Sequence, residues 1–142
     1  MGTKRPDWDK YFLSIAREVS RRSTCIRRHY GAVIVKDNKI VSTGYNGSAS
    51  GRDNCCDIGF CKRNELNIPH GERYELCEAV HAEMNAIING DPDKMKDATI
   101  YIYGEDDNGH IVKANPCMMC ERFIINAGIT RTVISNDMSE YM

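Results

Sequence analysis

Hydrophobic residues recur along the chain with two spacings, one typical of helices and the other of strands. After Asp7, apolar residues three or four positions apart predict a helix over about 7–22 with Asp7 as its cap. Its predicted buried face comprises Trp8, Phe12, Ile15, Ala16 and Val19. Two apolar runs, 32–35 and 39–43, flank Asp37-Asn38. That dipeptide has the chemistry of a two-residue turn, so the runs predict an antiparallel hairpin.

The second half of the chain alternates helical and strand patterns. A helix is expected from near Glu78 to Asn89-Gly90, with a buried face of Val80, Met84, Ile87 and Ile88. A strand over 98–103 follows, and 104–115 contains Asp107-Asn108-Gly109, which indicates an inserted turn or small hairpin. Pro116 suits the start of a last helix that ends at Gly128. The expected buried face of that helix is Cys120, Phe123, Ile124 and Ala127, and a strand over 130–135 follows it.

This order of elements predicts an α/β fold. We expect a three-layer α/β/α sandwich with a mixed central sheet, in which the first hairpin is antiparallel and the third and fourth strands are parallel. The 142 residues, 42% of them hydrophobic, are the usual size of a single domain, here 1–142. The sequence has no apolar run of about 18 residues and no secretory leader, so we expect a cytoplasmic protein that does not enter a membrane.

Charge and cysteine content narrow the function further. The chain has 19 Lys and Arg against 20 Asp and Glu, and this balance argues against a broad surface for nucleic acid. Arginines gather between the first helix and the first strand, and we expect one or two of them to meet a phosphate. Seven cysteines is an odd number. In a reducing compartment they are better explained as metal ligands and buried thiols than as disulfides.

Two short motifs carry the chemistry. His81-Ala82-Glu83 and, further on, Pro116-Cys117-Met118-Met119-Cys120 each open a helical pattern. One imidazole and two thiolates would bind Zn²⁺ with its fourth position left for water. Glu83 is then the candidate catalytic acid and base, because it lies two residues from the ligand His81. The alternative is half of a structural zinc site beside a buried histidine.

A second metal site is predicted from the segment 52–78. Its apolar periodicity is too weak for it to fold by burial alone, and a loop of this length is usually functional or held by other means. Four thiolates could close a tetrahedral structural zinc site, with His70 or Cys56 as a substitute for one of them. The candidate ligands are Cys25, Cys55, Cys61 and Cys77. The alternative is that these cysteines are small buried side chains.

Four longer motifs follow one another along the chain. They are Cys25-Ile26-Arg27-Arg28-His29-Tyr30-Gly31-Ala32-Val33-Ile34-Val35, Thr43-Gly44-Tyr45-Asn46-Gly47, Val80-His81-Ala82-Glu83-Met84-Asn85-Ala86-Ile87 and Pro116-Cys117-Met118-Met119-Cys120. Together they resemble the cytidine and deoxycytidylate deaminase superfamily, most closely its deoxycytidylate branch; His-x-Glu followed by Pro-Cys-x-x-Cys is the signature of zinc deaminases. The resemblance implies zinc-dependent conversion of dCMP to dUMP and ammonia, in a homo-oligomer and, in regulated members, under a nucleotide effector. It also implies that Asn46 touches the sugar, Ala82 offers its backbone to the base, and Arg27 lies near the phosphate.

Two other classes of function are weighed against a free-nucleotide deaminase. A base deaminase acting on transfer RNA or single strands would need a basic stripe with exposed aromatic residues, which the charge balance does not provide. A catalytically silent zinc-binding module would have lost Glu83 or gained a fourth protein ligand, and the sequence indicates neither. The free-nucleotide enzyme is therefore favoured.

Overall fold

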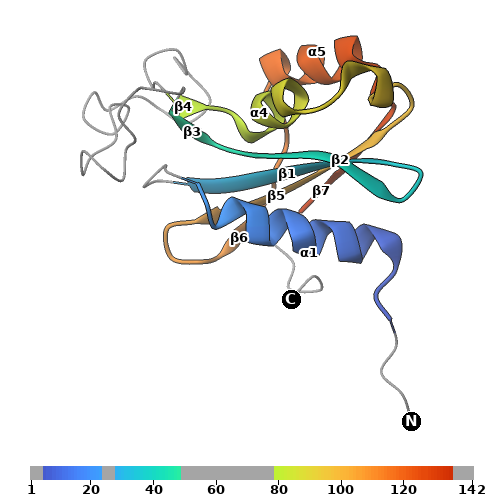
Figure 1. Ribbon diagram of the computed structural model, residues 1–142. Coiled ribbons are helices and arrows are strands. Elements are labelled where there is room, and N and C mark those ends of the chain that lie inside the picture. The colour runs from blue at the N-terminus through green and yellow to red at the C-terminus, as the bar shows by residue number, and fades with distance from the viewer. Residues whose placement is uncertain (1–4, 24–27, 49–78, 136–142) are drawn as a thin grey trace.

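A mixed sheet forms the middle layer of the protein and helices cover both of its faces (Figure 1). The computed structural model describes residues 5–23, 28–48 and 79–135. Helix α1 (Trp8–Ser20) lies on one face, and α4 (Ala82–Asn89) and α5 (Met118–Ala127) lie on the other. The main strands are β1 (Arg28–Lys36), β2 (Lys39–Tyr45), β5 (Thr99–Asp106), β6 (Ile111–Val112) and β7 (Arg131–Ile134). The predicted three-layer α/β/α architecture is confirmed.

The sheet has the predicted mixture of strand directions. β1 pairs antiparallel with β2, and the turn residues Asp37 and Asn38 have φ of 52° and 62°, as a type I′ hairpin requires. β5 lies antiparallel to β1 on its other side, from Thr99 opposite Val35 to Asp106 opposite Arg28. β7 runs parallel to the first half of β5. The strand order β2-β1-β5 therefore places the longest strands, β1 and β5, side by side in the centre.

Helix α1 matches the prediction in extent and in most of its buried face. Asp7 caps it, since its side chain accepts a hydrogen bond of 2.8 Å from the Lys10 amide. The predicted residues Phe12, Ile15, Ala16 and Val19 are buried or pack against the core, but Trp8 is 55% exposed. The helix packs on Gly31 of β1, where a side chain would overlap the Ala16 carbonyl oxygen. Small residues at the contact let the helix approach the strand closely.

Helix α4 begins later than predicted, because Ala79–Val80 form a short strand, β4, instead of a helical turn. β4 pairs antiparallel with β3 (Gly47–Ser48) in a ladder of two residue pairs. The predicted buried face is only partly right: Ile87 packs against the core, but Ile88 is 70% exposed and the fully buried apolar residues are Ala82 and Ala86. Small side chains face the sheet here because the helix lies very close to β2.

Helix α5 and the segment before it follow the prediction more closely. β5 and β6 form the expected small hairpin, with Gly104 opposite Val112. Cys117 caps the helix, and Gly128 ends it with φ of 88°, a left-handed conformation that favours glycine. Cys120 and Ile124 are buried as expected, but Phe123 is 44% exposed. α5 connects β5 to the parallel strand β7.

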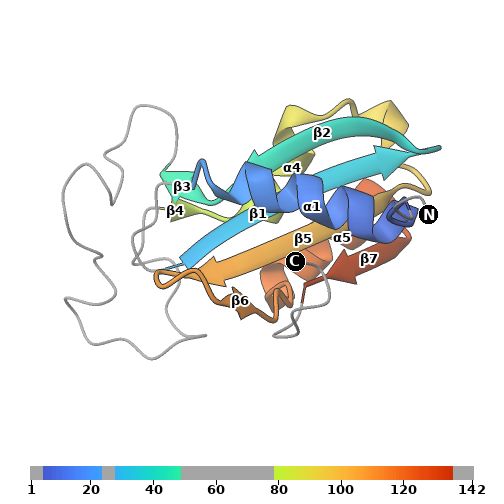
Figure 2. The ribbon, with the colours of Figure 1, turned by 90° about the horizontal axis from the view of Figure 1, so that it is seen from below.

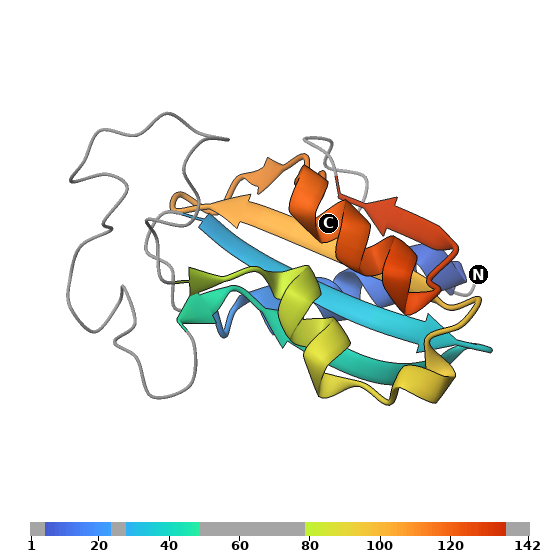
Figure 3. The same ribbon diagram turned by 90° about the horizontal axis from the view of Figure 1, so that it is seen from above.

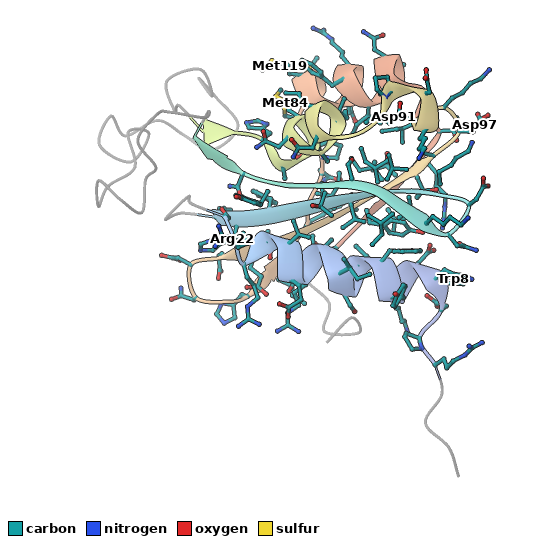
Figure 4. All side chains as sticks on the ribbon, viewed as in Figure 1. Trp8, Arg22, Met84, Asp91, Asp97 and Met119 are labelled. Carbon is teal, nitrogen blue, oxygen red and sulfur yellow. The ribbon has the colours of Figure 1, made fainter. Side chains whose placement is uncertain are left out.

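Each face of the sheet has its own apolar core. One core, between the sheet and α1, includes Phe12, Leu13 and Tyr103, and α1 runs obliquely across the strands there (Figure 2). Trp8 lies at the start of α1 and Arg22 just beyond its end (Figure 4). The other core lies under α4 and α5, which both begin at the end of the sheet where β5 ends (Figure 3). None of the helices in the described residues is both long and apolar enough to cross a membrane.

Asp9 joins the outer layer to the sheet, and its removal gives a first prediction. Its carboxylate accepts hydrogen bonds from both terminal nitrogens of Arg131, at 3.0 and 2.6 Å, and from the Tyr101 hydroxyl at 2.9 Å. The Arg131 guanidinium holds the pKa of Asp9 below its usual value. We expect Asp9→Asn to lower the free energy of unfolding at pH 7 by roughly 0.5–1.5 kcal/mol, since the pair is partly exposed.

The same pair predicts a pH dependence. A carboxyl whose pKa is lower in the folded state stabilises the fold above its unfolded pKa of about 3.9, and the effect is lost as pH falls through the folded value. Urea unfolding of wild type and Asp9→Asn should therefore differ at pH 7 and converge at lower pH. Asp107→Asn, in the exposed β5–β6 turn, serves as the control. A difference that stays constant with pH would contradict this role.

Candidate functional site

Three metal-ligand side chains converge where α4 and α5 begin. The ligand atoms of His81, Cys117 and Cys120 all lie within 4.8 Å of one another. The Nδ1 atom of His81 is 3.1 Å from the Cys120 sulfur and 3.6 Å from the Cys117 sulfur. The structure thus brings together the three residues that the two sequence motifs predict as ligands, although 36 and 39 positions separate His81 from the two cysteines.

The spacing of these atoms fits a tetrahedral zinc ion. With Zn–S of about 2.3 Å and Zn–N of about 2.0 Å, tetrahedral geometry places the nitrogen about 3.5 Å from each sulfur. The observed distances of 3.1 and 3.6 Å lie on either side of that value. One nitrogen and two sulfur ligands are a donor set that zinc accepts, with one position left for water or substrate.

Local structure explains why these side chains are available. His81 and Cys117 occupy the capping positions of α4 and α5, where the backbone is extended and the side chain projects beyond the helix. His81 makes no side-chain capping bond, and Cys117 accepts a hydrogen bond of 3.4 Å from the Cys120 amide. Both cysteines thus lie in the first turn of a helix, where the helix dipole favours negative charge.

Glu83 lies against this cluster and is only 7% exposed. Burial raises the pKa of its carboxyl, and hydrogen bonds from its own backbone and from Cys120 partly oppose the rise. Burial likewise raises the pKa of Cys120, as do the charges of Glu83 and Cys117. A buried carboxylate and two thiolates repel one another unless a cation lies among them. The electrostatics of the site therefore favour binding of a divalent metal.

Asn46 enters the site by a route that the sequence did not predict. Because Gly47 pairs with Val80 in the β3–β4 ladder, Asn46 and His81 occupy the next positions on the two chain segments. The Asn46 side chain, 7% exposed, is held at the start of β1. Its Oδ1 accepts a hydrogen bond of 2.8 Å from the Tyr30 amide, and its Nδ2 donates one of 2.9 Å to the Arg28 carbonyl.

The other predicted site residues have different outcomes. Ala82 is the first residue of α4, where a backbone N–H has no acceptor within the helix, and its side chain packs into the core. Arg27 lies outside the described residues. So do all candidate ligands of the second zinc, which are Cys25, Cys55, Cys61 and Cys77, together with the substitutes Cys56 and His70. The second zinc site stays a prediction that a count of zinc per chain would test.

Gly44, two residues before Asn46, leaves room for α4 and not for a ligand: a Cβ on Gly44 would overlap the Ala86 amide. Asn85 was not singled out as a site residue from the sequence, although its Nδ2 donates a hydrogen bond of 2.7 Å to the Tyr45 carbonyl. Its place in the motif around His81 and Glu83 is the sequence signal that could have drawn attention to it.

Comparison with known proteins agrees with this geometry. The family model of the cytidine and deoxycytidylate deaminase zinc-binding region matches residues 6–136. The deoxycytidylate deaminase of Mycobacterium phage D29 is 39% identical over 134 residues, which cover 91% of this chain and 94% of the phage protein. The deoxycytidylate deaminase of Schizosaccharomyces pombe is 33% identical over 91% of this chain. The match spans only 37% of that yeast protein.

Solved structures show the same fold at lower identity. The dCMP deaminase of cyanophage S-TIM5 in its apo form aligns with a TM-score of 0.62 at 24% identity, covering 98% of this chain and 90% of the phage chain. A second structure of that enzyme, in complex with dCMP and dUMP, aligns with a TM-score of 0.60 at 23% identity, covering 93% and 83% of the two chains. The three-layer architecture is therefore shared with these deaminases.

A ligand substitution tests the proposed metal centre. Cys117→Ser removes a thiolate but places a preferred capping residue at the start of α5, so the helix should persist. We expect zinc affinity to fall by more than the roughly 10–100-fold that loss of an outer-shell partner costs. Zinc content after dialysis measures the effect, and circular dichroism checks the fold. Met118→Ser, at the exposed neighbouring position, is the control; equal zinc retention by both variants would exclude Cys117 as a ligand.

Proposed function

The chain belongs to the cytidine and deoxycytidylate deaminase family, and on this basis we propose that it hydrolyses dCMP to dUMP and ammonia with a bound zinc ion. The observation that carries the proposal is the convergence of His81, Cys117 and Cys120 beside the buried carboxyl of Glu83. A silent zinc module does not need a carboxyl at that position. The names of the phage and yeast relatives support deoxycytidylate as the substrate.

His81, Cys117 and Cys120 would hold the zinc ion. When bound there, zinc would act as a Lewis acid and lower the pKa of its water to about 7, so that the water can lose a proton at neutral pH. Glu83 would accept a proton from the attacking water and pass it to the ring nitrogen of cytosine, which makes C4 more electrophilic. The water oxygen would form its bond to C4 as a hydroxyl group. Glu83 would then move the proton of that hydroxyl to the amino group, so that the C4–N bond breaks, ammonia leaves and the hydroxyl oxygen becomes the uracil carbonyl.

The chain's own groups would hold the nucleotide for this reaction. The backbone N–H of Ala82, at the start of α4, is proposed to contact the base. Asn46, at the neighbouring position across the short ladder, is proposed to contact the sugar. Arg27 is proposed to bind the 5′-phosphate, with Arg28 as the second candidate. Because a guanidinium can make two charge-assisted hydrogen bonds to one phosphate, this contact would favour a nucleotide over a nucleoside.

A substrate screen tests this function. We expect ammonia release from dCMP to be at least about tenfold more efficient than from deoxycytidine, because the phosphate contact is charge-assisted. Arg27→Ala should reduce that preference, whereas Arg5→Ala, at an exposed position before α1, should leave it unchanged. Efficient release from single-stranded oligonucleotides with none from dCMP would favour the polynucleotide deaminase instead. No release from any cytosine compound would favour the silent zinc module.

The role of Glu83 is tested by an isosteric change. Glu83→Gln keeps the shape of the side chain but cannot accept and return a proton, so we expect turnover of dCMP to fall by roughly 10²–10⁴-fold with zinc retained. Zinc analysis and steady-state kinetics on the same preparation measure both quantities. Glu121→Gln, an exposed carboxylate in the first turn of α5, is the matched control. Near-normal turnover by zinc-loaded Glu83→Gln would rule out the mechanism.

The remaining expectations stay predictions. The resemblance implies a homo-oligomer and, in regulated members, a nucleotide effector. A cytoplasmic location is likewise expected for an enzyme of nucleotide metabolism. Size-exclusion chromatography with light scattering would measure the assembly, and dCMP kinetics with added nucleoside triphosphates would detect an effector.

A further inference from the structure

The carbonyl groups along the outer side of β2 have partners on α4. Among the described strands, β2 pairs only with β1, so its other edge lacks a strand neighbour. Asn85 Nδ2 donates a hydrogen bond of 2.7 Å to the Tyr45 carbonyl, and Asn89 Nδ2 donates one of 3.1 Å to the Thr43 carbonyl. The asparagines lie one helical turn apart, and the carbonyls lie two residues apart on the strand. Side-chain amides thus take the place of a neighbouring strand.

These bonds act together with close packing. Ser42 donates from its hydroxyl to the Ala86 carbonyl at 2.6 Å, and the missing side chain of Gly44 leaves room for the backbone of α4. The helix is therefore held to β2 along its length. Its first turn contains Ala82 and Glu83, so the position of the proposed acid and base depends on this attachment.

Asn85 differs from Asn89 because the backbone carbonyl that it binds belongs to the residue next to Asn46. Tyr45 directly precedes Asn46, and the Asn46 side chain is bonded to the backbone of Tyr30 and Arg28 at the start of β1. The bond from Asn85 therefore links the first turn of α4 to the residue proposed to contact the sugar. The bond from Asn89 joins the last residue of the helix to a strand position further from the site.

We propose that Asn85 is a positioning residue that fixes Glu83 and the backbone of Ala82 relative to Asn46. This inference rests on the proposed function, in which those groups act on one nucleotide. Base and sugar must then be held in register while Glu83 moves protons at the ring. A misplacement of about 1 Å can cost on the order of 10²-fold in rate, so a bond that fixes this separation affects catalysis more than stability.

The test compares Asn85→Ala with Asn89→Ala, which remove the same kind of bond to the same strand. Alanine is a better helix former than asparagine, so both variants should keep α4. We expect Asn85→Ala to lower kcat for dCMP by at least about tenfold with KM changed by less than about threefold, and Asn89→Ala to stay within about threefold of wild type in both. Zinc content and melting temperature should be similar in the two variants.

A second readout does not depend on activity. The Tyr30 amide donates to Asn46 Oδ1, so its hydrogen exchange should be faster in Asn85→Ala than in Asn89→Ala. If Asn85→Ala does not fold, Asn85→Asp and Asn89→Asp are compared in the same way, since aspartate keeps the shape but has no N–H to donate. Equal losses in kcat and equal Tyr30 exchange in the two variants would overturn the inference. Wild type inactive on dCMP would instead refute the proposed function, and the exchange comparison would still test the link to Asn46.

Discussion

The geometry of the site depends on how closely the first turn of α4 approaches β2. A Cβ on Gly44 would lie 2.6 Å from the Ala82 carbonyl oxygen, so any side chain there would push the helix away from the strand. His81 and Glu83 would move with the helix, whereas the cysteines belong to α5. A contact between one glycine and a helix backbone therefore controls the alignment of ligands that come from separate segments of the chain.

The electrostatics of the site impose a second constraint. Burial raises the pKa of both Glu83 and Cys120. The charge of Glu83 raises the pKa of Cys120 further, whereas the hydrogen bond with Cys120 lowers the pKa of Glu83. Without a cation, the repulsion between a carboxylate and two thiolates is avoided when the thiols stay protonated. Zinc needs the thiolate forms, so metal binding must release protons and is favoured as pH rises. Cys117 and Cys120 at the start of a helix reduce the cost of that ionisation, because the helix N-terminus stabilises negative charge.

Much of this fold follows from patterns of apolar residues. The hairpin of β1 and β2 and the parallel pair β5 and β7 were predictable because the runs are rich in β-branched residues and turn signals bound them. The extents of α1 and α5 followed from their caps. The zinc ligands were predictable because two motifs of fixed spacing specify them without reference to the fold.

Backbone contacts explain what the sequence could not predict. The buried face of α4 was only partly predictable, because the close approach of its backbone to Gly44 turns Ala82 and Ala86 toward the sheet and leaves Ile88 exposed. The β3–β4 ladder joins two residue pairs from segments about 30 positions apart in the chain. Main-chain hydrogen bonds define such a ladder, and it carries no apolar periodicity. The place of Asn46 beside His81 was therefore visible only in the structure.

That placement determines what Asn46 can still bind. A side-chain amide has two N–H donors and an oxygen with two lone pairs. One N–H is used on the Arg28 carbonyl and one lone pair on the Tyr30 amide. Within the part of the chain that the structure describes, one donor and one acceptor are left over, which would suit a sugar hydroxyl because a hydroxyl both accepts and donates a hydrogen bond. The two backbone bonds would orient the amide for the proposed contact without exhausting it, so the same residue could order the start of β1 and bind the substrate.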